Sequence, residues 1–213
     1  MIIPEASLLG LFVVAAMVLL LTPGPAVLYI VTRSVEQGRL AGLVSALGVH
    51  VGTLVHVAAA ALGVSALLVS SALAFDIVKY LGALYLIYLG VRKLMGWDQP
   101  AGGRALAPHS LRRLFAQGVV VNVLNPKTAL FFLAFLPQFV DVSKGAVGVQ
   151  ILVLGLIFVA LGVLSDGLYA VAAGTAGAWL KREGRLLRAE RYVSGSVFVG
   201  LGVTAALAGN GRK

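Results

Sequence analysis

Charged and titratable side chains lie inside long apolar stretches of this chain, and their types could bind and move a charged solute. Lys127 and Asp166 both lie within apolar runs, where an ionised side chain costs about 2.5–3.5 kcal/mol on membrane-insertion scales. Both lie too deep to reach the interface, so we expect them to face the protein interior. We hypothesise that they interact across a binding site, where Asp166 exchanges a proton. A static buried ion pair, or an Asp166 that only caps interfacial structure, would also explain them.

Two histidines and two asparagines add polar groups to the same apolar stretches. His50 and His56 lie on different faces of one predicted helix, and either could relay a proton because imidazole titrates near neutral pH. Hydrogen-bonded packing between helices is the alternative. Asn122 and Asn125 share a face if their turn is helical, so they could bind a substrate or join two helices. None of these residues has metal-ligand spacing and the chain has no cysteine, so we predict no metal site and no cofactor.

Two of the apolar stretches are interrupted by proline near their centres. The interruptions are Thr22-Pro23-Gly24-Pro25 and Asn125-Pro126-Lys127, at matching positions of the two halves of the chain. Thr22 and Asn125 are N-cap types followed by proline, which predicts a helix that ends and restarts at each point. A restarted helix offers unpaired N–H groups and a partial positive charge to an anion such as a carboxylate. Simple proline kinks are the alternative, but matched interruptions typically mark a transporter's binding site.

The elements that must position these residues are transmembrane helices. The 213 residues are 60% hydrophobic and only 12% charged, with a mean hydropathy of +0.99, so we predict an all-α polytopic membrane protein. A helix needs about 20 apolar residues to cross a bilayer. Six stretches qualify as candidate spans, and the last of them is short: 6–32, 41–69, 73–94, 114–140, 146–173 and 192–207.

The basic residues predict the orientation of these spans. The net charge is +9, but the basic residues form no stripe with interleaved aromatic residues, so we do not predict nucleic-acid binding. Twelve of the 17 basic residues lie in three alternate connections, four lie on the other side of the predicted membrane, and Lys127 lies within a span. Because basic residues favour the cytoplasmic side, we predict that the three connections are cytoplasmic and that both termini are periplasmic. The twelve are Arg33, Arg39, Arg92, Lys93, Arg104, Arg112, Arg113, Lys181, Arg182, Arg185, Arg188 and Arg191.

The chain divides into two halves around a linker rich in glycine and proline. We predict a three-helix repeat over residues 1–95, a cytoplasmic linker over 96–113 and a second three-helix repeat over 114–213. An odd number of spans per half inverts the second half relative to the first. Inverted repeats place one central site within reach of both sides of the membrane.

The proline-containing segments and their surroundings resemble the LysE/RhtB family of bacterial amino-acid exporters. The first half carries Thr22-Pro23-Gly24-Pro25, Ser34-x-x-x-Gly38-Arg39-x-Ala41-Gly42-Leu43 and Ala46-Leu47-Gly48. The second carries Asn122-x-Leu124-Asn125-Pro126-Lys127-x-Ala129-Leu130-Phe131-Phe132 and Phe135-Leu136-Pro137-Gln138-Phe139. The resemblance covers the whole chain and implies proton-driven export of amino acids or derivatives across the inner membrane. Some relatives have an acidic residue where this chain has Thr53, which weakens the case for a strongly cationic substrate.

Together these observations predict a secondary active exporter that works by alternating access in the lipid bilayer. A zwitterionic amino acid would place its carboxylate near Gly24 and Lys127 and its ammonium near Asp166 or backbone carbonyls, and protons would reset the cycle. The sequence is compatible with a homodimer without requiring one. The alternatives are export of a metal or other small ion, and a membrane-embedded enzyme or non-transporting protein. Phosphate loops and nucleophile motifs are absent from the sequence, so we expect no enzyme.

Overall fold

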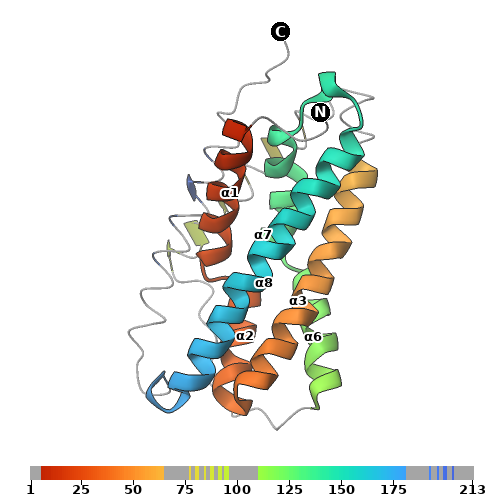
Figure 1. Cartoon of the computed structure of the whole chain (residues 1–213). Helices are drawn as coiled ribbons and strands as arrows, with labels where there is room; N and C mark the ends of the chain where they lie inside the picture. The colour runs from red at the N-terminus through yellow and green to blue at the C-terminus, as the bar shows by residue number, and fades with distance from the viewer. Residues whose placement is uncertain are drawn as a thin grey trace.

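The computed structural model describes residues 6–64 and 110–180, with single residues between 77 and 95 and between 192 and 203. Every element in this part of the chain is helical (Figure 1). Two helices are long and apolar enough to cross a membrane on their own, and two further pairs qualify if each bent pair is one span. The prediction of a helical membrane protein is therefore confirmed. The predicted spans 73–94 and 192–207, most of the 96–113 linker and hence the inverted repeat lie largely outside the described residues.

The first predicted broken helix is present. Helix α1 (Ala6–Leu21) and helix α2 (Pro25–Gln37) are bent by 51° relative to each other at a short break. The prediction that Thr22 caps the restarted helix is wrong, because α2 is capped by Gly24 and has Pro25 in its first turn. A residue before proline disfavours the helical conformation, and Gly24 is accordingly extended, with φ −144° and ψ −172°. The hydroxyl of Thr22 instead donates to the Val18 carbonyl of α1.

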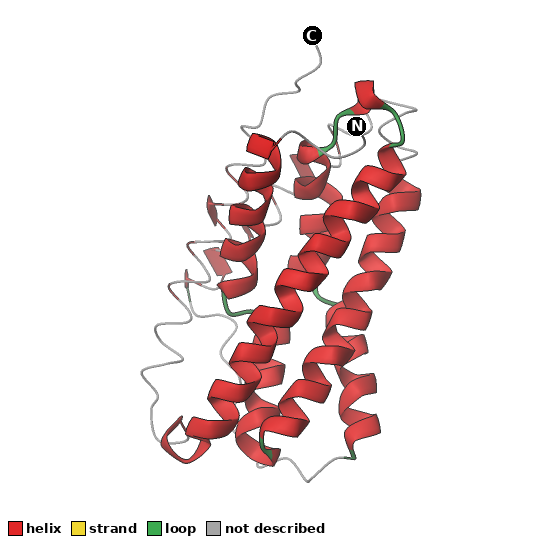
Figure 2. Cartoon of the chain, in the orientation of Figure 1, coloured by secondary structure: helices red, strands yellow, loops and turns green. Residues whose placement is uncertain are grey.

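The second predicted broken helix is also present and has the predicted cap. Helix α6 (Leu111–Val123) is followed by α7 (Pro126–Leu130), a π-helical turn η2 (Phe131–Phe135) and a 3₁₀ turn η3 (Leu136–Phe139). The segment Pro126–Phe139 is bent by 47° from α6. The side chain of Asn125 accepts a hydrogen bond from the Lys127 N–H, as an N-cap residue does. Figure 2 shows both breaks as short loops about midway along the bundle.

Two continuous helices pack against the broken pairs. Helix α3 (Arg39–Ala59) continues into a π-helical turn η1 (Ala60–Val64), and α8 (Val147–Leu180) follows a short 3₁₀ turn η4 (Val142–Lys144). Gly38 joins α2 to α3 with φ +87°, a conformation that favours glycine.

Helices α3 and α6 approach each other closely because glycine lines both faces. A Cβ atom at Gly48 would overlap the Phe115 carbonyl, one at Gly52 would lie 2.7 Å from the Val119 carbonyl oxygen, and one at Gly118 would lie 2.6 Å from the Ser45 carbonyl oxygen. Small residues four positions apart along a membrane helix allow such close contact between backbones. Gly48 and Gly52 therefore serve the packing of α3 on α6.

An aromatic core fills the bundle on one side of the two breaks. Six phenylalanines from α1, α8 and the segment after the second break have neighbouring ring centroids 4.7–6.1 Å apart. All six are almost fully buried: Phe12, Phe131, Phe132, Phe135, Phe139 and Phe158. The opposite end holds the α2–α3 turn, the start of α6 and the end of α8 together (Figure 1). The aromatic core thus closes the bundle toward the end that carries η4.

Candidate functional site

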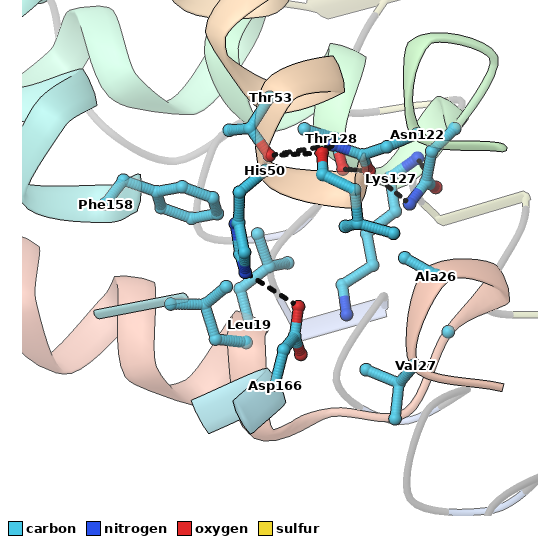
Figure 3. Close-up of a pocket in the computed structure, with 14 residues that line it drawn as sticks. Leu19, Ala26, Val27, His50, Thr53, Asn122, Lys127, Thr128, Phe158 and Asp166 are labelled. Carbon is cyan, nitrogen blue, oxygen red and sulfur yellow. Dashed lines mark hydrogen bonds and ion pairs between the residues drawn. The ribbon is translucent and has the colours of Figure 1, made fainter. Parts of the chain in front are cut away.

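The two helix breaks meet at one buried cavity. Its volume is about 30 Å³, which accommodates a water molecule or two, whereas sites for small organic ligands are usually about 300–1,000 Å³. Its polar side chains come from the second break and from α3 and α8, whereas the first break contributes Gly24 (Figure 3). The lining residues are Leu19, Leu20, Gly24, Ala26, Val27, Val49, His50, Thr53, Asn122, Asn125, Lys127, Thr128, Phe158 and Asp166.

Lys127 reaches from the second break to the first. It lies at the start of α7 and only 7% of its surface is exposed. Its Nζ donates a hydrogen bond to the Thr22 carbonyl oxygen at 2.5 Å, where the end of α1 leaves carbonyl groups without helical partners. A Cβ atom at Gly24 would lie 3.2 Å from the lysine Cδ, so the side chain crosses the first break directly over the glycine. The predicted interior position of Lys127 is confirmed.

Asp166 of α8 contacts His50 of α3. The His50 Nε2 and an Asp166 carboxylate oxygen are 3.2 Å apart, an ion-pair distance at which the ring N–H does not have hydrogen-bond direction. Asp166 is 3% exposed and His50 is 5% exposed, so the predicted interior position of Asp166 is also confirmed. A Cβ atom at Gly162 would lie 2.5 Å from the imidazole Cε1. Glycine at this position of α8 therefore makes room for the ring.

This pair leaves buried polar atoms unsatisfied. Both ring nitrogens of His50 and the Oδ1 of Asp166 have no hydrogen-bond partner among the residues that the structure describes. A buried polar group without a partner costs about 1–3 kcal/mol, and such groups in native proteins call for a functional explanation. In Figure 3 the imidazole and the carboxylate point toward each other at the edge of the cavity, with Lys127 across from them.

Asn122 ties three elements together beside Lys127. Its amide donates to the Val49 carbonyl at 2.9 Å and to the Thr53 hydroxyl at 2.8 Å, both on α3. Its side-chain oxygen accepts from the Asn125 amide at 3.2 Å and from the Thr128 hydroxyl at 3.0 Å. The predicted proximity of Asn122 and Asn125 is therefore present. This network fixes the geometry of the second break against α3.

Several residues predicted for the site lie outside the cavity lining. His56 stacks on Phe132 with ring centroids 6.3 Å apart, and its Nε2 lies 2.9 Å from the Asn122 carbonyl oxygen, which accepts from it. That is the packing alternative considered for this histidine. The lining also omits Thr22, Pro23, Pro25 and Pro126, which form the two breaks themselves.

Sequence reasoning missed the apolar wall of the cavity and a polar cluster near it. Periodicity cannot separate Leu19, Val27 or Phe158 from ordinary core residues. Arg33, counted as a loop residue in the orientation argument, is 5% exposed within α2. Its guanidinium donates to Gln117 at 3.2 Å and pairs with Glu36 at 3.4 Å. No sequence signal identified this contact, because the two helices involved are joined only by tertiary packing.

The structure describes a helical membrane protein with a small cavity, lined by polar and apolar side chains, where two broken helices meet. Comparison with known proteins defines it further: the model of the LysE type translocator family matches residues 17–209. An uncharacterized membrane protein of Pseudomonas aeruginosa is 34% identical over 92% of this chain and 94% of its own length. The chain belongs to the LysE type translocator family, and it is therefore a membrane transporter rather than an enzyme.

Two relatives carry more specific names. A protein of Enterobacter sp. strain 638, named leucine efflux protein, is 31% identical over 92% of this chain and 93% of its own length. A leucine efflux protein of Salmonella choleraesuis is 34% identical over 67% of this chain and 68% of its own. No solved structure matches the chain.

Proposed function

We propose that this protein exports a zwitterionic amino acid with an apolar side chain across the bacterial inner membrane, in exchange for protons. The proposal rests chiefly on one observation: a single buried cavity is lined by a lysine, a carboxylate paired with an imidazole, and apolar side chains. An α-amino acid has the complementary groups, namely a carboxylate, an ammonium and a side chain. The leucine efflux relatives support an aliphatic side chain.

In this proposal each group of the substrate has its own place. The carboxylate binds beside Lys127 and the first N–H groups of α2, where the helix dipole adds to the lysine charge. The ammonium binds at Asp166. Leu19, Val27 and Phe158 form the wall against which the side chain packs. The described lining contains no second carboxylate, so a cationic side chain such as that of lysine would have no partner there.

The small cavity supports a transport cycle with a closed state. A volume of about 30 Å³ is too small for an amino acid, so substrate binding requires the elements around the breaks to move apart. We assign this movement to alternating access, in which the two broken spans belong to inverted repeats that open the site to one side at a time.

Counterflow in proteoliposomes tests the proposed function. Vesicles loaded with unlabelled leucine should accumulate radiolabelled leucine, and those loaded with lysine should not. An imposed pH gradient should then drive leucine against its concentration gradient. Absence of counterflow with every aliphatic amino acid would refute the proposal, and equal counterflow with lysine would refute the assigned substrate class.

A further inference from the structure

A short charge contact in the cavity joins the proposed ammonium site to a histidine. His50 and Asp166 come from different helices, α3 and α8, are 5% and 3% exposed, and lie 3.2 Å apart. Asp166, the carboxylate proposed to bind the ammonium, therefore lies next to His50. The imidazole of His50 becomes positively charged when it is protonated. Imidazole is the side chain whose ordinary titration range lies closest to neutral pH.

The unpaired atoms show that this contact leaves capacity for another ligand. Asp166 Oδ1 and both ring nitrogens of His50 lack a hydrogen-bond partner within the described part of the chain, and both residues line the cavity. A carboxylate oxygen can accept from an ammonium, and a ring nitrogen can take up a proton. The pair can therefore exchange one cation for another without breaking other hydrogen bonds.

Among the described residues, the other ionisable groups near the pair have fixed partners. Lys127 faces the cavity from α7 and donates to the Thr22 carbonyl. Tyr169 lies three residues after Asp166 on α8 and donates to the Leu21 carbonyl at 2.8 Å. Helix α1 carries no titratable side chain. On α2, Tyr29 and Arg33 bond to Leu114 and Gln117 of α6, and His56 of α3 faces Phe132.

We infer that a proton on the His50–Asp166 pair and the ammonium of the substrate exclude each other, and that this competition couples export to proton entry. This inference rests on the proposed function and names the groups that carry out the coupling. Without the proton, Asp166 is an anion that binds the ammonium. With the proton, the pair is neutral overall, whichever of the two residues carries it, so no net negative charge is left to attract the ammonium.

The exchange balances in both protons and charge. On the periplasmic side one proton binds the pair and the zwitterion leaves. On the cytoplasmic side the next zwitterion binds, its ammonium keeps its three protons, and the pair releases one proton to the cytoplasm. Each cycle therefore moves one positive charge inward for each neutral zwitterion exported. His50 gives the pair a second site for this proton, because an imidazole nitrogen can accept one.

Proton release by the purified wild-type protein tests this inference directly. The protein is solubilised in detergent in an unbuffered solution that contains a pH-sensitive dye, at a starting pH where the pair is protonated. Leucine is then added to a saturating concentration. About one proton should appear per leucine bound. Leucine binding without proton release would overturn the inference and leave amino-acid export intact. Absence of leucine binding and of counterflow would instead refute the proposed function.

The variant His50→Gln, with His56→Gln as its matched control, tests the assigned residue. Wild-type affinity for leucine should fall about tenfold per pH unit below the midpoint of the pair, because one proton competes with one substrate. His50→Gln should bind leucine with an affinity that is flat from pH 6 to 8 and should exchange leucine without being driven by a pH gradient. His56→Gln should keep the wild-type pH dependence. The same slope in His50→Gln would overturn the inference; the wild-type proton release decides the matter if that variant does not fold.

Discussion

At the scale of single residues, the buried charged side chains are the best guide to the chemistry of this structure. Lys127 and Asp166 are 7% and 3% exposed, and ionisable groups in membrane spans are expensive and usually functional. Lys127 is stabilised by the carbonyl at the end of α1. Within the described part of the chain, the carboxylate of Asp166 forms an ion pair with His50. The lysine is therefore held in place, whereas the carboxylate keeps an oxygen for a ligand.

Replacement of Lys127 by alanine should strongly reduce transport while leaving the protein inserted in the membrane. The proposed carboxylate site loses its cation, and hydrogen bonds to charged groups contribute about 1.5–3 kcal/mol, so leucine counterflow should fall by about 10–150-fold. Lys144→Ala is the matched control, because that lysine is about one-third exposed in a loop and pairs with Asp141. Counterflow in proteoliposomes containing equal amounts of each protein measures the effect. Wild-type counterflow by Lys127→Ala would show that the lysine does not take part in substrate binding.

Sequence reasoning found the charged residues of the site but not how they combine. The insertion cost of a buried charge is a local property, so the interior positions of Lys127 and Asp166 could be predicted. The contact of Asp166 with His50 depends on how α3 packs on α8, which residue spacing does not encode. Thr22 was assigned as a cap because of its type, yet Pro-Gly-Pro moves the start of α2 to Pro25, since the residue before a proline avoids helical geometry.

At the scale of the elements, the breaks could be predicted because proline acts locally, whereas the packing of the helices could not. Proline removes a backbone donor and clashes with the preceding turn, and two breaks result, bent by 51° and 47°. The close approach of α3 and α6 depends on glycines of both helices. The partner residue Gly118 and the position of the carbonyls that face it required the structure.

The glycine contact between α3 and α6 should tolerate no added methyl group. In Gly48→Ala the new Cβ would overlap the Phe115 carbonyl, which belongs to the backbone and cannot rotate away. Overpacking of this kind costs about 1–3 kcal/mol, so the thermal unfolding midpoint in detergent should fall by roughly 3–10 °C. Gly10→Ala is the control, because no atom lies within 4 Å of the added Cβ. Equal midpoints for the two variants would contradict the close contact.

The contact of α2 with α6 should hold the cavity closed toward the end that carries the α2–α3 turn. The Tyr29 hydroxyl donates to the Leu114 carbonyl at 2.7 Å, one helical turn before Arg33 bonds to Gln117. Loss of one such hydrogen bond is worth about 0.5–1.5 kcal/mol. Tyr29→Phe should therefore shift the equilibrium toward the state open at that end by about two- to tenfold.

A cysteine at Val27 can report this opening, because Val27 lines the cavity and the chain contains no cysteine. In inside-out vesicles, an impermeant maleimide should label Val27→Cys faster when Tyr29→Phe is also present. Tyr88→Phe is the control, since that hydroxyl bonds to Arg92 of the same helical stretch. Unchanged labelling with Tyr29→Phe would show that this contact does not close the site.

At the scale of the whole molecule, the distribution of charge and the position of the connections agree. The α2–α3 turn, the start of α6 and the end of α8 lie at one end of the bundle (Figure 1), and twelve of the 17 basic residues were assigned from sequence to connections at these points. Arg33 proved to be buried in α2, but it lies in the half of that helix nearest the turn. Basic residues favour the cytoplasmic side, so we propose that this end faces the cytoplasm and the η4 end faces the periplasm.

Single cysteines can test this orientation because the chain has none of its own. Leu111 lies at the start of α6 and is 43% exposed, and Ser143 is exposed in η4 at the other end. In intact cells an impermeant maleimide that passes the outer membrane should label Ser143→Cys and should label Leu111→Cys only after the inner membrane is permeabilised. The reverse labelling pattern would show that the protein has the opposite orientation in the membrane. It would also make the Tyr29 contact a periplasmic closure, so that proton entry and substrate exit would have to use the opposite ends of the cavity from those proposed.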